Sequence, residues 1–357
     1  MRERHRLHAG SGGNRVKWQV AAAIGLVVAV AAVVVAAVTV VRHDDTSTGL
    51  AATPTAAPNL TAPPGGAGGG GGPTPPKTGA WVGAVVQPPD FTKKSEEQAV
   101  LDWESQMGRK MDVVHTYHTW DNPFPDEVDR WAVANGRTLL LSWGGTDTRV
   151  IQSGKYDDLI RQRAAAVKAF GQPILLEWRW EMDRPNLQSQ IWTPEDYVAA
   201  WTHIRAIFAR AKVTNVSWVW CPTADGFASG RAQKYYPGDA QVDWTCADVY
   251  PGENDSSFQT QAAAYLDWAK QHPKPAIIGE YGAYGGFPGG QATWVQQAAA
   301  EAKQNPLIKG LVYFNWDDQS GRPRTQLSLR GDNDAVGAYR AFVADPYFNQ
   351  RSLPVSR

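Results

Sequence analysis

The segment PILLEWRWEMDRPN, Pro173–Asn186, changes character halfway along its length. Its first half is aliphatic, with Ile174–Leu176 forming a short apolar run that is typical of a buried β-strand. The next seven residues, Glu177–Asp183, contain four charged side chains and two tryptophans. A strand that served only for packing would remain apolar, so this pattern indicates a strand that ends at a functional site.

Seven further segments resemble this strand, and all eight alternate with helix-like segments between Ala80 and Phe348. Helical apolar spacing is clearest in Glu195–Lys212, which follows a Thr-Pro start signal, and in Ala292–Lys303. Strands separated by helices imply parallel crossovers, and eight units in roughly 270 residues fit a (β/α)8 barrel. The predicted strands are Trp81–Val86, Asp112–Tyr117, Arg137–Trp143, Pro173–Arg179, Asn215–Trp220, Asp243–Val249, Ala276–Gly279 and Ile308–Phe314.

An open, doubly wound sheet is the alternative fold. Its first strand–helix turn normally carries a glycine fingerprint for a nucleotide. The corresponding turn here, VVQPPDFT, has no glycine, which favours the barrel.

Two glutamates occupy equivalent places in such a barrel, at the ends of the fourth and seventh strands. Glu181 ends the opening segment, where a regular strand would place Glu177, Arg179 and Glu181 on one side. Glu280 follows the strand Ala276–Gly279 in KPAIIGEYGAYGG. Either glutamate alone is compatible with a salt-bridged acid at a strand end. Facing each other across the barrel mouth, the pair predicts glycoside cleavage, which needs one acid and one carboxylate nucleophile.

The N-terminal part of the chain has a different composition. An uncharged apolar run, residues 20–41, is long enough to span a bilayer, and residues 1–19 before it are basic. We expect a cytoplasmic tail, a single transmembrane anchor in the lipid bilayer and an extracellular remainder; the alternative is a cleaved secretory signal. Residues 42–79 are rich in Thr, Ala, Pro and Gly and predict a linker. Residues 80–350 then form the barrel, and 351–357 a short tail. The basic residues of the flank are Arg2, Arg4, Arg6, Arg15 and Lys17.

The overall composition narrows the range of partners. Lysine plus arginine equals aspartate plus glutamate, at 35 each, which argues against nucleic-acid binding. The sequence has no CxxC, HExxH or histidine cluster, so we expect neither a metal nor another cofactor. We expect a monomer that binds a polysaccharide.

The longer blocks of the barrel region resemble glycoside hydrolase family 26, a β-mannanase-like family of retaining enzymes. The resemblance covers nearly all of Ala80–Phe348 and is carried by long ordered segments. These are TPEDYVAAWTHIRAIFARAKVTNVSWVWCPT (Thr193–Thr223), YYPGDAQVDWTCADVYPG (Tyr235–Gly252) and AIIGEYGAYGG around Glu280. The resemblance implies a retaining hydrolase of β-glycosidic bonds, closest to an endo-β-1,4-mannanase.

The same resemblance implies roles for individual residues. Glu181 matches the acid/base, Glu280 the nucleophile, and Tyr250 a tyrosine that contacts the nucleophile. Trp316 matches an aromatic residue beneath the cleaved sugar, and we expect Trp120 to line the same cleft. The tryptophans on helices are expected in the core instead: Trp131, Trp201 and Trp268.

The acid/base block departs from the usual His-Glu-Met-Asn-Gly of the family. Here it begins with Trp180 and ends with Asp183 and Arg184, which leaves the reaction type intact but changes the contacts beside the sugar. Trp180 and Arg179 complete the predicted substrate-binding residues. Three alternatives therefore remain open: another β-glycanase of the clan, a hydrolase of cell-envelope glycan, and a carbohydrate-binding barrel without catalysis.

The two cysteines, Cys221 and Cys246, fall on the predicted fifth and sixth strands. These strands are neighbours in a barrel, and an exported domain meets oxidising conditions, so we predict a disulfide bond. Two free buried thiols are the alternative.

Overall fold

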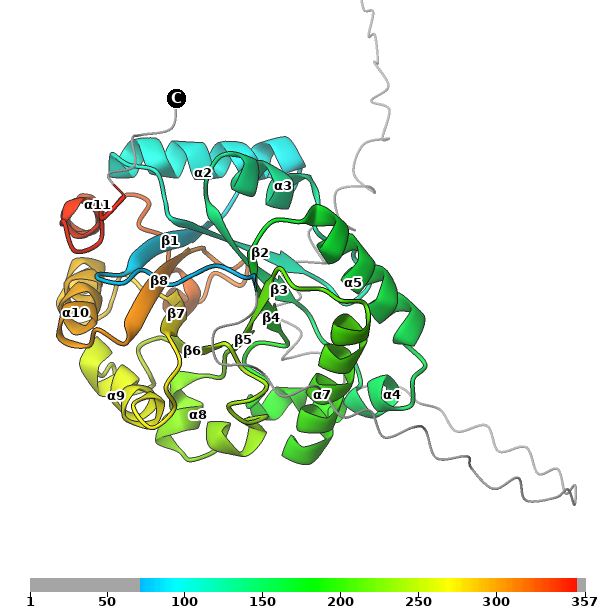
Figure 1. Ribbon diagram of the computed structural model, residues 1–357. Helices are drawn as coiled ribbons and strands as arrows, with labels where there is room; N and C mark the ends of the chain where they lie inside the picture. Colours follow the sequence, from blue (N-terminus) through cyan, green and yellow to red (C-terminus); the bar gives the residue numbers. More distant parts are fainter. Residues whose placement is uncertain (1–70, 352–357) are drawn as a thin grey trace, which may run out of the picture. The chain divides into compact units, whose positions relative to one another are not determined.

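A closed barrel of eight parallel strands, ordered β1 to β8, forms the centre of the protein (Figure 1). The computed structural model describes residues 71–351. It confirms the predicted barrel, and every predicted strand overlaps an observed one to within one or two residues at each end. The strands are β1 (Trp81–Val86), β2 (Val113–His118), β3 (Thr138–Trp143), β4 (Ile174–Trp178), β5 (Val216–Trp220), β6 (Trp244–Val249), β7 (Ala276–Tyr281) and β8 (Ile308–Asn315).

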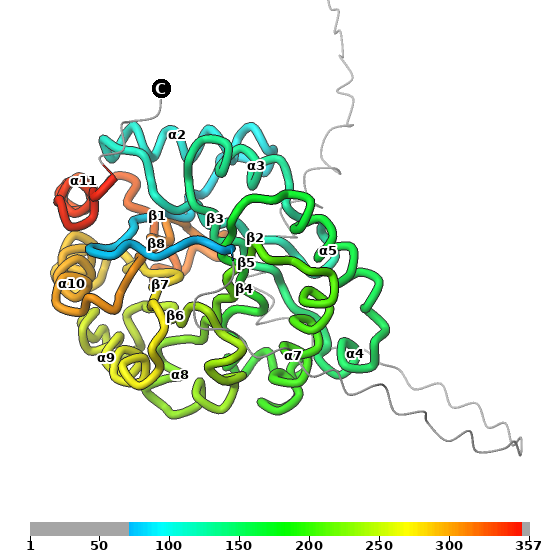
Figure 2. The backbone as a smooth tube through the Cα atoms, in the orientation of Figure 1, coloured from blue at the N-terminus to red at the C-terminus, as the bar shows by residue number. Residues whose placement is uncertain are grey.

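Helices follow the strands and surround the barrel, so the chain runs once around it (Figure 2). The longest, α7, begins where Thr193 accepts a hydrogen bond from the backbone N–H of Asp196 and Pro194 occupies the first turn. The helices are α2 (Lys93–Met107), α3 (Glu127–Ala134), α4 (Thr148–Gln152), α5 (Asp157–Phe170), α6 (Gln188–Ile191), α7 (Pro194–Arg210), α8 (Ala224–Ala228), α9 (Phe258–Ala269), α10 (Gly290–Gln304) and α11 (Asn333–Ala344). The short 3-10 helices are η1 (Pro185–Leu187), η2 (Ala232–Tyr235) and η3 (Pro323–Thr325).

The predicted tail 1–19, the predicted anchor 20–41 and most of the linker lie outside the described residues. Within residues 71–351, no helix combines the length and the apolar character that a membrane crossing needs.

Alternate residues of each strand serve two different cores. On β4, Ile174 and Leu176 pack outward against the helices, whereas Leu175 packs inside the barrel. At one level of the interior, Trp81 of β1 stacks on Trp244 of β6 with ring centroids 5.5 Å apart. The interior is therefore filled with side chains, and Glu177, two residues beyond Leu175, points into it.

The upper part of the interior is closed by a disulfide bond between Cys221 and Cys246, whose Cα atoms are 4.3 Å apart. Both cysteines are fully buried in the interior cluster. Gly279 of β7 packs directly on this bond: a Cβ atom there would lie 2.6 Å from the Cys246 sulfur and 2.9 Å from Oδ1 of Asp248. The disulfide and Asp248 thus leave room only for glycine at this point of β7.

We predict that Gly279→Ala lowers the free energy of unfolding by about 1–3 kcal/mol, because the added methyl group overpacks this interior layer. Gly337→Ala on α11 is the matched control, since its Cβ would meet no atom within 4 Å. In the control, loss of backbone entropy from the unfolded chain raises stability by up to about 1 kcal/mol. Urea unfolding of the two variants and the wild type measures both changes; equal stability of the Gly279→Ala variant and the wild type would contradict the prediction.

Candidate active site

The backbone changes direction directly after β4. The strand ends at Trp178, and both Arg179 (φ 54°) and Glu181 (φ 51°) adopt the left-handed conformation. The strand therefore does not continue regularly to Glu181, so simple alternation does not set the directions of Arg179 and Glu181. Left-handed non-glycine residues are uncommon and are concentrated at functional sites. Here the turn allows the N–H of Glu181 to donate to the carbonyl oxygen of Cys221 at 2.7 Å, which attaches this loop to the end of β5.

Asp183 fixes the same loop from below. Its carboxylate is fully buried and accepts hydrogen bonds from Thr223, from the backbone N–H at 2.9 Å and from the hydroxyl at 2.6 Å. Arg231 donates from Nε to the carbonyl oxygen of Asp183 at 2.7 Å. A buried carboxylate with several donors is a stable anchor, so Asp183 positions Glu181 without facing the cavity itself.

Glu181 lies at the wall of a cavity and is only 7 % exposed. Burial raises the pKa of the Glu181 carboxyl group to about 8, and the negative charge of Glu280 acts in the same direction. The guanidinium group of Arg184, which pairs with Oε1 of Glu181, acts against this rise. Glu181 therefore holds its proton at neutral pH, as a general acid must.

Both carboxylate oxygens of Glu280, on β7, accept hydrogen bonds from tyrosine hydroxyl groups. The hydroxyl of Tyr117 donates to Oε1 and that of Tyr250 to Oε2, each at 2.6 Å. Burial, with the nearby charge of Glu280, raises the pKa of both tyrosines well above the usual value, so both remain donors. A carboxyl group that only accepts hydrogen bonds suits a nucleophile.

A β-bulge turns Glu280 toward the barrel interior. Ala247 of β6 pairs with Ile278, but the next residue, Asp248, pairs with Glu280, which leaves Gly279 as the extra residue. Without the bulge, alternation would direct Glu280 outward, because Ile278 packs in the outer core. The bulge thus re-aims the side chain at the site.

Tyr117 and Asp248 are among the residues of the site that were missed from the sequence. Tyr117 lies four residues after Val113 on β2, so the alternation of side chains directs both into the barrel. This alternation could have identified Tyr117 from the sequence. Asp248 is 3 % exposed and faces the cavity. Burial and the charges of Glu280 and Glu181 raise the pKa of Asp248 well above its usual value.

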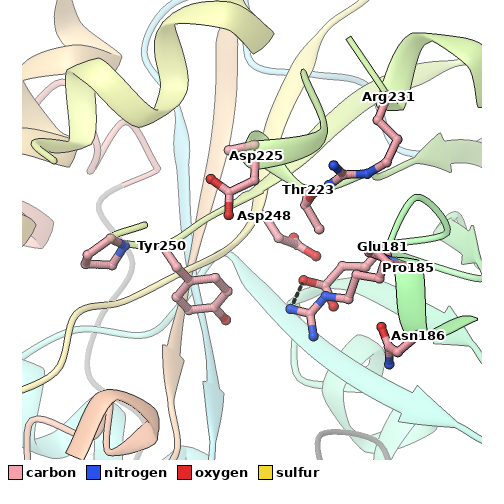
Figure 3. Close-up of a pocket in the computed structure, with 11 residues that line it drawn as sticks. Glu181, Pro185, Asn186, Thr223, Asp225, Arg231, Asp248 and Tyr250 are labelled. Carbon is pink, nitrogen blue, oxygen red and sulfur yellow. Dashed lines mark hydrogen bonds and ion pairs between the residues drawn. The ribbon is translucent and has the colours of Figure 1, made fainter. Parts of the chain in front are cut away.

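The cavity has a volume of about 330 Å³ and opens beside Glu181 (Figure 3). Its size is at the lower end of the usual range for ligand pockets. The wall contains both carboxyl and guanidinium groups, and Arg184 pairs directly with Glu181. The lining residues are Glu181, Arg184, Pro185, Asn186, Thr223, Ala224, Asp225, Arg231, Asp248, Tyr250 and Pro251.

Two predicted tryptophans lie at the mouth of the barrel. Trp180 packs edge-on against Tyr117, with ring centroids 5.1 Å apart. Trp316 follows β8 and packs against Phe91 at 5.9 Å and Phe314 at 6.0 Å. Both rings adjoin the interior cluster and are only partly buried, so they are placed to contact a sugar face.

The structure corrects the predictions for Trp120 and Arg179. Trp120 is 6 % exposed and stacks on Trp143 at 4.5 Å in the outer core, so its faces are used in packing and it does not line the cavity. Arg179 is 9 % exposed and donates to the side chain of Gln190 at 2.7 Å, so its guanidinium group is largely buried in the protein. Burial lowers its pKa to about 10.

Two clusters in the described residues have the composition of a metal site. One combines Glu177 with Cys221 and Cys246, but both sulfur atoms are joined in the disulfide. The other combines His118, Asp126 and Asp129. Its two aspartates form the capping box of α3, and Asp126 also pairs with Lys93 at 2.6 Å. The sulfur atoms of the first cluster and the aspartates of the second therefore already have partners in the fold.

Comparison of the sequence with known proteins identifies relatives among polysaccharide hydrolases, although no family model matches the chain. Endoglucanase H of Acetivibrio thermocellus is 30 % identical over 292 residues, which cover 75 % of this chain and 30 % of the relative. A β-1,3-xylanase of Vibrio sp is 28 % identical over 139 residues, covering 36 % of this chain and 28 % of the relative. The chain therefore spans less than a third of the length of these relatives.

Comparison of the structures finds the same barrel in family 26 β-mannanases. The β-mannanase BoMan26A of Bacteroides ovatus superimposes with a TM-score of 0.58 at 19 % identity, covering 78 % of this chain and 91 % of the other. The endo-β-1,4-mannanase of Bacillus sp. JAMB-750 gives 0.57 at 16 % identity, covering 76 % and 87 %. The chain has the barrel fold of these enzymes, so its resemblance to glycoside hydrolase family 26 is confirmed at the level of the fold.

Proposed function

We propose that this protein is a retaining glycoside hydrolase that cleaves β-glycosidic bonds in an extracellular polysaccharide, most similar to an endo-β-1,4-mannanase. One observation carries the proposal: two glutamates from opposite sides of one barrel mouth have different surroundings. Glu181 is buried and holds its proton to a pKa of about 8, while Glu280 accepts two tyrosine hydrogen bonds. Acid/base and nucleophile roles need this division.

In the first step, a carboxylate oxygen of Glu280 attacks the anomeric carbon as the bond to the leaving oxygen breaks. Glu181 gives its proton to that oxygen, and a covalent glycosyl ester forms on Glu280. In the second step, water attacks the anomeric carbon, Glu181 accepts the proton of this water, and Glu280 leaves as carboxylate. The hydroxyl groups of Tyr117 and Tyr250 donate hydrogen bonds that stabilise the negative charge returning to the Glu280 oxygens.

The cavity is the place for the leaving part of the substrate. Glu181 lines it and Glu280 does not, so a sugar bound there faces the acid and leaves the nucleophile on the other side of the bond. The side chains of Asn186 and Asp225 offer hydrogen-bonding groups to its hydroxyls. Trp180 and Trp316, near the mouth, offer apolar faces to the sugar that is transferred.

A second candidate function is hydrolysis of a different β-glycan. The names of the sequence relatives, an endoglucanase and a β-1,3-xylanase, favour it. Trp180 and Arg184 replace family residues beside the scissile bond, and a few contacts to hydroxyls are enough to change the preferred sugar.

A panel of purified polysaccharides tests the proposed function. The full chain should release reducing ends from β-1,4-mannan faster than from β-1,4-glucan, β-1,3-xylan or peptidoglycan. Glu181→Gln, Glu280→Gln double variants serve as the matched control, because they keep the shape of the site. Preferential cleavage of another β-glycan would support the second candidate; binding without any cleavage would reject both.

The two glutamates should respond differently to truncation. Glu181→Ala should lower turnover of the polysaccharide about 10²–10⁴-fold and be partly rescued by azide on substrates with a good leaving group. Glu280→Ala should lower it further and leave binding nearly unchanged. For the wild type, kcat/KM should fall as pH rises through about 8, because Glu181 loses its proton.

Proton NMR of the first-formed product checks the mechanism. A retaining enzyme releases the product with the anomeric configuration of the substrate. Inverted configuration, or wild-type turnover in the Glu280→Ala variant, would contradict the roles assigned above.

We further propose that residues 20–41 anchor the protein in the cell membrane, with residues 1–19 cytoplasmic and the barrel outside. The basic flank and the length of the apolar run support this topology. Protease treatment of intact cells should release a soluble fragment that contains the barrel and leave a small membrane-bound remnant. A mature protein that begins after Val41 and is free in the medium would instead identify a cleaved signal.

A further inference from the structure

Arg184 makes a direct contact with the proposed general acid. It follows Glu181 by three residues, just before η1, and Nη2 donates to Oε1 of the Glu181 carboxyl group. The side chain of Arg184 is 39 % exposed and lines the cavity, whereas that of Glu181 is 9 % exposed. A dashed line at the labelled Glu181 marks this contact in Figure 3.

This contact opposes what a general acid needs. A guanidinium group favours the ionised carboxylate, and the first step requires the protonated form. The neighbouring acids act in the opposite direction: Glu280 from β7 and Asp183 from the same loop both disfavour a second negative charge. The other charged or titratable groups facing the pair are Asp248, Tyr250, Asp225 and Arg231.

The contact also selects one of the two oxygens of Glu181. Because Arg184 occupies Oε1, the proton is left to Oε2. In the second step, when Glu181 takes a proton from water, the same guanidinium group stabilises the ionised form that starts the step. Arg184 therefore assists one step and limits the other.

We propose that Arg184 is a positioning residue for Glu181: it orients the carboxyl group in the cavity and sets the upper pH limit of the reaction. The proposal rests on the acid/base role of Glu181 under the proposed function. The position holds glycine in the usual family block quoted above, so this device belongs to this chain's own sequence.

The experiment compares pH profiles of kcat/KM for the full-length wild type and two variants on the polysaccharide that it cleaves. Arg184→Gln removes the cation, so the alkaline limb should move up by about one pH unit or more, with a lower kcat from the misdirected carboxyl group. Arg184→Lys keeps the charge and should return the limb close to its wild-type position. An unmoved limb in Arg184→Gln would overturn the proposal, even if activity fell.

Arg161→Gln is the matched control. Arg161 pairs with Asp158, also with a spacing of three residues, but on the outer helix α5. Its removal should leave the pH profile unchanged. A similar shift in this control would assign the effect to net charge and reject a specific role for Arg184.

Carbon NMR titration of glutamate carboxyl groups separates this inference from the proposed function, because it needs no substrate. The Glu181 signal is assigned by its loss in Glu181→Gln. In Arg184→Gln its midpoint should rise above that of the wild type, and in Arg184→Lys it should stay close to it. If the Glu181 midpoint rises in Arg184→Gln but the wild type cleaves no polysaccharide, the effect of Arg184 on Glu181 stands and the proposed hydrolase function is rejected. If the midpoint does not rise, the proposed role of Arg184 is rejected.

Discussion

The hydrogen bonds from Thr223 to the buried carboxylate of Asp183 connect the end of β4 to the end of β5, and the position of Glu181 depends on them. The chain leaves β4 through two left-handed residues, which cost conformational energy. Asp183 and the bond from Glu181 N–H to Cys221 offset that cost. The geometry leaves little freedom around the carboxylate: a Cβ atom on Gly226 would overlap its Oδ2. A strained loop can present a reactive side chain reproducibly only when its neighbours fix it from more than one direction.

The interior of the barrel changes from apolar to polar along its axis. On β2, Val113 is followed on the same face by His115 and Tyr117; on β4, Leu175 is followed by Glu177. Some of these groups bond to one another, since Ser142 donates to Oε2 of Glu177 and lies 2.7 Å from Nε2 of His115. Burying charged and polar groups is costly unless they are hydrogen-bonded, so this polar layer is worth retaining only where it supports a reaction at the mouth. The apolar layer provides the rigid base, and the disulfide lies beside Glu177 of the polar layer.

The fold and the two glutamates could be predicted from the sequence because both follow from local patterns. Short apolar segments marked all eight strands, and position at a strand end marked Glu181 and Glu280. Backbone irregularities could not be predicted in this way. The left-handed turn at Arg179 removed that side chain from the site, and the bulge at Gly279 turned Glu280 inward against simple alternation. Trp120 was misassigned because a tryptophan after a strand can stack on an outer-core neighbour as well as line a cleft, and the sequence does not show that neighbour.

The departures from the family block lie where they alter the substrate without removing the reaction. Trp180 packs against Tyr117, which donates a hydrogen bond to the proposed nucleophile. The indole ring therefore lies on the nucleophile side of the site. Arg184 contacts the proposed acid and the cavity, so it is coupled to the leaving-group side. Both substitutions therefore change contacts on either side of the scissile bond, while the strands that carry Glu181 and Glu280 keep their places in the barrel. Reaction type is set by the barrel and its strand ends, whereas substrate preference is set by these loop residues. Under the proposed function, the loop that follows β4 is therefore expected to influence sugar preference, which the barrel fold alone does not determine.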